Sequence, residues 1–75
     1  MHNSDIQLIE REDLWNGEVI ERLINRAGTP HTAILKHGVE VASAPTSEEA
    51  SLIRWWKRYG RKMWRNRRKK KEGEN

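Results

Sequence analysis

The arginine side chains near the C-terminus are the groups in this sequence best suited to bind an anion. Drawn as an α-helix, residues 47–70 place five arginines alternately four and three residues apart, at Arg54, Arg58, Arg61, Arg65 and Arg68. This spacing follows one face of a helix. Guanidinium groups bind phosphate oxygens bidentately, and like charges at this spacing repel one another until an anion binds. The pattern therefore predicts a partner that carries several negative charges.

Aromatic side chains are interleaved with these basic ones. Trp64 lies roughly 80–100° from the apolar face of the same helix, and we expect it to be exposed, where an indole can stack on a base. No Asp or Glu occurs in residues 51–71, although a helix that is merely solvated usually mixes both signs. The residues predicted to bind nucleic acid are Arg54, Lys57, Arg58, Arg61, Lys62, Trp64, Arg65, Arg68 and Lys69.

The other reactive residue types form no recognisable catalytic or metal site. His2, His31 and His37 have no metal-ligand spacing, and the chain has no cysteine, so we expect neither a metal nor a cofactor. The sequence contains no glycine-rich phosphate loop and no nucleophile–base pair, so we do not expect an enzyme. The acidic residues that we expect to be solvated or to contact the basic helix are Glu10, Glu12, Asp13, Glu18 and Glu21.

Charge is divided unequally along the chain. Residues 1–49 contain four basic and nine acidic side chains, a net charge of −5, whereas residues 50–75 contain eleven basic and two acidic ones, a net charge of +9. Such asymmetry is typical of a basic arm that binds a polyanion or an acidic protein surface. It also allows the two halves to attract each other.

The length of 75 residues limits the protein to one domain with a small core. We therefore expect a homodimer, with its contact at residues 15–23 or at the edge of the hairpin described below. The apolar runs are too short to span a membrane, and the N-terminus lacks a signal-peptide pattern. Together with the absence of cysteine, this favours a cytoplasmic protein.

The basic helix is expected over residues 47–70, with residues 71–75 disordered. Its apolar face consists of Leu52, Trp55, Trp56, Tyr59 and Met63, and we expect Trp55 and Trp56 to anchor the core.

Two further features concern the start and the middle of this helix. Thr46 and Glu49 have the spacing of a capping box at its start. Gly60 costs about 1 kcal/mol relative to Ala inside a helix and predicts a bend or a close backbone contact there.

The N-terminal third contains two competing signals. Ile6 and Leu8 alternate within residues 4–10, which favours a short edge strand. Asn16–Gly17 is a typical hairpin turn. Its flanks do not alternate, however, so we predict an amphipathic helix over residues 13–27, or one that begins only after Gly17. Its apolar residues are Trp15, Val19, Leu23 and Ala27.

Residues 32–43 predict a β-hairpin with His37–Gly38 as its turn. A two-residue loop places Ile34 opposite Val41 and Lys36 opposite Val39. We expect the apolar face of this hairpin, formed by Ile34, Val39 and Val41, to pack on the helices. The order of hairpin, cap and amphipathic helix over residues 32–56 is similar to a segment of double-stranded-RNA-binding domains and of the arm-binding domains of some integrases.

The sequence therefore predicts one small α+β domain over residues 1–70, with the order (β)αββα and a long basic amphipathic C-terminal helix. Its predicted function is non-enzymatic binding of DNA or RNA through phosphate contacts of that helix. The alternative is a small regulator or inhibitor, of a kind common in bacteriophages, that docks on an acidic surface of a larger host protein. We do not expect membrane binding, because the tryptophans are needed in the core.

Overall fold

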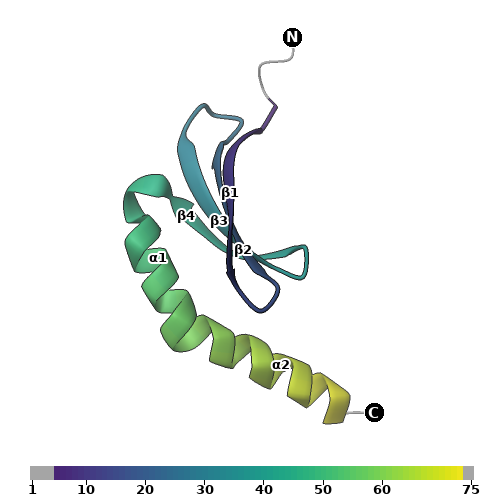
Figure 1. The fold of residues 1–75 in the computed structure, drawn as a ribbon. Coiled ribbons are helices and arrows are strands. Elements are labelled where there is room, and N and C mark those ends of the chain that lie inside the picture. Colours follow the sequence, from purple (N-terminus) through teal and green to yellow (C-terminus); the bar gives the residue numbers. More distant parts are fainter. Residues whose placement is uncertain (1–4, 74–75) are drawn as a thin grey trace.

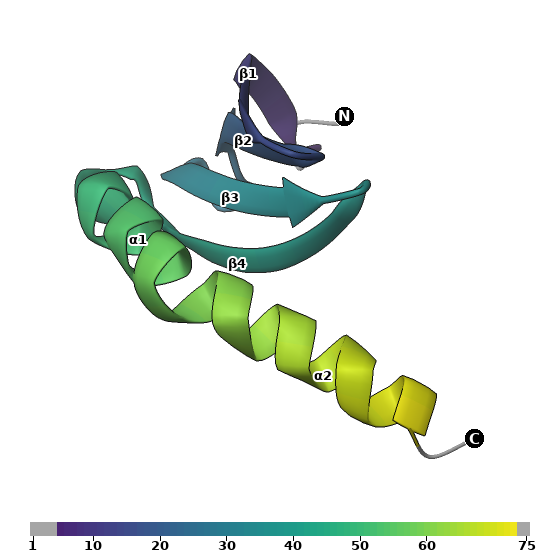
Figure 2. The same cartoon turned by 60° about the horizontal axis from the view of Figure 1, so that its bottom comes forward.

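The computed structural model describes the backbone of residues 5–73 and the side chains of residues 5–67. Four strands form one antiparallel sheet in chain order: β1 (Gln7–Trp15), β2 (Glu18–Ile24), β3 (Pro30–Lys36) and β4 (Val39–Pro45). A 3₁₀ turn, η1 (Thr46–Glu48), then leads into helix α1 (Glu49–Trp55), a π-helical turn, η2 (Trp56–Gly60), and helix α2 (Arg61–Gly73). Figures 1 and 2 show the helical segment running along β4, with α2 extending past the end of the sheet.

The α+β class and the C-terminal helix are confirmed, but the predicted helix over residues 13–27 is wrong. This segment forms the end of β1, a tight turn and β2. Asn16 (φ 46°) and Gly17 (φ 83°) both lie in the left-handed region, as a type I′ hairpin turn requires. The predicted order (β)αββα is therefore replaced by four strands followed by the helical segment.

The error has a simple geometric origin in the four-residue spacing of the apolar side chains. Four is a whole number of strand repeats as well as about one helical turn, so Val19 and Leu23 can share a face in either structure. In the sheet, Glu18, Ile20 and Arg22 lie on the opposite face of β2 from these two residues. The predicted edge strand at residues 4–10 does lie at an edge, but it begins at Gln7 and continues to Trp15.

The predicted hairpin at residues 32–43 is confirmed, with His37 (φ 51°) and Gly38 (φ 83°) as its turn. Lys36 faces Val39 as expected. Beyond the next pair, a bulge shifts the register so that Ile34 faces Ala42, not Val41. The expectation that Val39 packs in the core is wrong, since its side chain is exposed.

The start of the helical segment differs from the predicted capping box. Thr46 makes no capping hydrogen bond; its hydroxyl lies 3.2 Å from that of Thr32. Glu49 instead accepts hydrogen bonds from Arg22 (2.7 and 2.9 Å) and from Thr32 (2.8 Å) on the sheet. The cap residues therefore attach the helix to the strands. Within the described residues, no helix combines the length and the apolar content needed to cross a bilayer.

The core lies between one face of the sheet and the first turns of the helical segment. Ile20 and Ile34 from the strands meet Leu52 and Trp56 from the helical segment. Trp56 is 2% exposed, which confirms its predicted role, whereas Trp55 is 39% exposed and does not anchor the core. The helical segment buries only a narrow stripe against the sheet, and Tyr59 and Met63 are exposed. The wider apolar face that we predicted is therefore wrong.

Gly60 makes the close contact that its position in the helix predicted. A Cβ atom at this residue would overlap the ring of Trp56. The surrounding turn is π-helical, and the amide of Arg61 donates to the carbonyl of Trp56, five residues earlier. Gly60 therefore allows the Trp56 ring to lie against the helix backbone, and the wide turn changes which side chains face the sheet beyond it.

Candidate nucleic-acid interface

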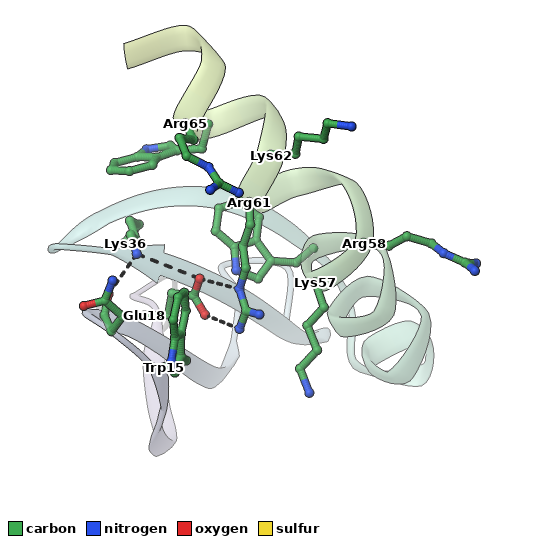
Figure 3. Close-up of a pocket in the computed structure, with 11 residues that line it drawn as sticks. Trp15, Glu18, Lys36, Lys57, Arg58, Arg61, Lys62 and Arg65 are labelled. Carbon is green, nitrogen blue, oxygen red and sulfur yellow. Dashed lines mark hydrogen bonds and ion pairs between the residues drawn. The ribbon is translucent and has the colours of Figure 1, made fainter. Parts of the chain in front are cut away.

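Glu18 is the buried centre of the polar contacts between the sheet and α2. It follows the Asn16–Gly17 turn, and the carboxylate accepts two hydrogen bonds of 2.7 Å from the Arg61 guanidinium. Lys36, its direct partner on β3, places its ammonium nitrogen 3.9 Å from Glu18 Oε2. Figure 3 shows these three side chains converging at the base of a pocket. Two cations around one carboxylate leave this base with a net positive charge.

The ionisation of this cluster follows from its contacts. Burial opposes ionisation of Glu18, but the hydrogen bonds from Arg61 and the positive charges of Arg61 and Lys36 outweigh that cost and hold the pKa of Glu18 below its usual value. The hydrogen bond to Glu18 also raises the pKa of Arg61. Arg61 is therefore a structural link between α2 and the sheet. Its predicted place on an exposed arginine face is wrong.

The Lys36 side chain is buried, and its ammonium group lies near two indole rings. Its Nζ lies 5.6 Å from the ring centroid of Trp15 and 5.2 Å from that of Trp64, distances at which a cation is attracted to an aromatic face. It also donates a hydrogen bond of 2.8 Å to the Asn16 carbonyl. Trp64 packs against the hydrophobic core and is only half-exposed, so the prediction of a freely exposed Trp64 is wrong.

Besides Arg61, four of the predicted cations line this pocket, whose volume is about 500 Å³. Their side chains are exposed, and they come from η2 and the first turns of α2: Lys57, Arg58, Lys62 and Arg65. In Figure 3, Arg65 is directed toward the pocket, whereas Arg58 and Lys62 point outward. No ion pair involves these four side chains within residues 5–67.

The remaining predicted cations lie elsewhere or cannot be placed. Arg54 is exposed on α1, outside the pocket. Arg67, which the sequence analysis did not select, is exposed on α2 and lines a second pocket. Arg68 and Lys69 lie in α2, where the structure describes their backbone but not their side chains. The continuous arginine face is interrupted because one additional residue in the π-helical turn rotates the following positions by about 100°.

Two acidic residues of β1, Glu10 and Glu12, pair with Arg22 of β2. This guanidinium lies 3.2 Å from Glu10 and 3.0 Å from Glu12, besides its two hydrogen bonds to Glu49. The hydrogen bond from Arg22 is the main cause of the lowered pKa of Glu49. The prediction that an acidic residue contacts the basic helix is confirmed for Glu18. The carboxylates paired with Arg22 do not neutralise the cations at the pocket.

Sequence reasoning missed two residues of this site, Trp15 and Lys36. Both could have been found from the Asn16–Gly17 turn, because a two-residue hairpin loop pairs Trp15 directly with Glu18. The register of β2 and β3 then places Lys36 beside Glu18. The wrong helix assignment removed this signal.

Comparison with protein-family models, with curated proteins and with solved structures finds no match to this chain. Within the described residues, no group of three or more His, Cys, Asp or Glu side chains is arranged to hold a metal ion. The functional argument therefore rests on the geometry and charge of the site.

Proposed function

We propose that this protein is a non-enzymatic, cytoplasmic nucleic-acid-binding protein whose helical segment grips the phosphate backbone. The observation that carries the proposal is the group of exposed cations without a carboxylate partner within residues 5–67: Arg54, Lys57, Arg58, Lys62, Arg65 and Arg67. Such a group repels itself in the free protein, and the phosphates of a polyanion relieve the repulsion.

The position of these cations supports the same proposal. Most of them surround a pocket whose base is itself positive, since Lys36 and Arg61 share the single carboxylate of Glu18. Arg61 and Lys36 are fixed by their partners and act through their charge, while the exposed side chains are available for direct contacts. This division of roles suits binding to a flexible backbone of phosphates.

A salt series tests the proposal most directly. With about five phosphate contacts, the logarithm of the binding constant should fall against the logarithm of salt concentration with a slope of about −4 to −5 for a duplex. Arg58→Ala and Arg65→Ala should each reduce that slope by about one and weaken binding to all sequences alike. Fluorescence anisotropy with labelled oligonucleotides measures both quantities.

Arg26→Ala is the matched control for these substitutions. Arg26 is also exposed, but it lies in the loop between β2 and β3, at the opposite end of the sheet from the Asn16–Gly17 turn. Its removal should leave the salt slope unchanged. Absence of binding to a duplex, a single strand and an RNA hairpin at about 50 mM salt would refute the proposal.

One observation favours the alternative function of docking on an acidic protein. Exposed apolar side chains, among them Val39, Trp55 and Met63, line the second pocket, which also contains Arg67 and has a volume of about 770 Å³. Apolar anchors beside arginine are typical of protein interfaces. In that case the arginine variants would abolish 1:1 binding to one acidic protein, while binding to nucleic acid would be weak and unselective.

A further inference from the structure

Trp15 is an exposed aromatic residue at the border of the basic pocket. It ends β1 immediately before the Asn16–Gly17 turn, and it is 58% exposed. The Arg61 guanidinium carbon lies 4.8 Å from its ring centroid and the Lys36 Nζ lies 5.6 Å from it. Exposure of one aromatic residue is ordinary in itself. Trp15 differs from other exposed aromatic residues because Arg61 and Lys36, both held by Glu18, fix its ring beside the exposed cations of the pocket.

The two cations beside Trp15 contact the same carboxylate. Arg61 Nε donates a hydrogen bond of 2.7 Å to Glu18 Oε2, and Lys36 Nζ lies 3.9 Å from the same oxygen atom. Their shared partner fixes both cations beside the ring, while more than half of the Trp15 surface stays exposed. This exposed part of the indole is available to another planar group.

The charge around Trp15 specifies what kind of planar group fits there. Lys57 and Arg65 line the same pocket and are exposed, and Figure 3 shows them on either side of Arg61, with Trp15 below. A nucleotide combines a flat base with a phosphate, so it matches an indole face flanked by cations. A base in a duplex is already stacked on both faces and cannot offer one to a side chain.

We propose that Trp15 stacks on an unpaired base, so that the protein selects single-stranded nucleic acid over a duplex. This inference rests on the proposed function, because the exposed cations must hold the phosphates on either side of that base. It assigns the stacking role to Trp15 in place of Trp64, whose ring packs on the core and against Lys36. Preorganisation of the indole by Arg61 and Lys36 reduces the entropy that binding would otherwise cost.

The test compares one sequence as single-stranded DNA, as single-stranded RNA and as the corresponding duplexes, by fluorescence anisotropy. Trp15→Ala should weaken binding to the single strands by about 5- to 150-fold, the range of one base–aromatic stacking contact. Binding to the duplexes should change by less than about twofold, and the salt slope should stay the same because no charge is removed. Comparison of the DNA and RNA arms reports the preferred sugar.

Three further variants make the result interpretable. Trp15→Phe keeps a flat ring and should retain more affinity for single strands than Trp15→Ala does. Trp55→Ala removes an exposed tryptophan that lies outside this pocket, and should have no effect. Arg65→Ala should weaken binding to single strands and duplexes together and lower the salt slope.

Fluorescence gives a readout that is independent of affinity. A base stacked on Trp15 should quench part of the indole emission when an unlabelled single strand is added, and this part should be absent in Trp15→Phe. Circular dichroism must show the folded spectrum for each variant, since Trp15 contacts Arg61 and Lys36.

Different experimental results would refute base stacking by Trp15 and phosphate binding by the exposed cations. If the parent binds single strands and duplexes equally and Trp15→Ala changes neither, the stacking inference is overturned and phosphate binding stands. An equal loss for both forms in Trp15→Ala also overturns it. If the parent binds none of the oligonucleotides, both proposals fall.

Discussion

Contacts with arginine lower the pKa values of two carboxylates, Glu18 and Glu49, among the residues that the structure describes, and this makes stability depend on pH. The pKa values of Glu18 and Glu49 both lie below the ordinary value of 4.5 in the folded chain. A group whose pKa is lowered by folding stabilises the fold above its unfolded pKa, and this contribution is lost as pH falls through the folded value. The free energy of unfolding should therefore be level near neutral pH and decrease below about pH 4.5. Urea denaturation across the acid range measures this decrease.

Glu18→Gln separates the contribution of Glu18 to the pH dependence of stability from that of Glu49. This substitution leaves Arg61 and Lys36 without their carboxylate, so it should cost about 3 kcal/mol at neutral pH and make the remaining acid dependence shallower. Glu40→Gln is the control, because Glu40 is exposed on β4 and forms no ion pair within residues 5–67. An unchanged acid profile in Glu18→Gln would contradict the assignment.

The helical segment is attached to the sheet by one large apolar contact, Trp56. Its ring is buried among Ile20, Ile34 and Leu52 and lies against Gly60. Trp56→Ala should cost about 3–5 kcal/mol, which is comparable to the whole stability of a domain this small. Thermal unfolding followed by circular dichroism measures the loss.

The neighbouring tryptophan gives a matched control for this prediction. Trp55 lies one residue earlier in the helical segment but is much more exposed, so Trp55→Ala should cost far less than Trp56→Ala. If the two variants melt alike, the orientation of the helical segment is wrong.

The accuracy of the sequence analysis also differed between elements. The second hairpin was predictable from the His37–Gly38 turn, and the C-terminal helix from the three- and four-residue spacing of its side chains. The first hairpin was not, because a four-residue apolar spacing suits a helix and a strand equally, and the deciding signal was the Asn16–Gly17 turn alone.

At the candidate site, the sequence predicted which segment carries the exposed cations, but it did not predict how their side chains are arranged. The rotation introduced by the π-helical turn depends on the packing of the Trp56 ring against Gly60, which is a tertiary effect. The inward position of Arg61 depends on Glu18, more than forty residues away in the chain. Helical periodicity assumes a regular helix and carries no information about such contacts.

At the scale of the whole molecule, the exposed apolar side chains beside β4 predict self-association. Val39 and Met63 are 64% and 60% exposed and line the same pocket as Trp55, and β4 is an edge strand. A small core and exposed apolar side chains both favour pairing with a second copy. We expect a dimer at micromolar concentration, measured by sedimentation equilibrium.

Variants on the two sheet edges locate this contact. Met63→Lys, beside β4, should shift the equilibrium toward the monomer, whereas Leu8→Lys, on the exposed β1 edge, should not. A mass of 8.9 kDa at every concentration would exclude the dimer.

The order of the strands also has a consequence for how fast the chain folds. Each strand pairs with its neighbour in sequence, so each pairing closes only a short loop, at little entropic cost. Chains dominated by local contacts cross the folding barrier quickly. The sheet should therefore form early, and closure of the helical segment onto Ile20 and Ile34 should be the last step.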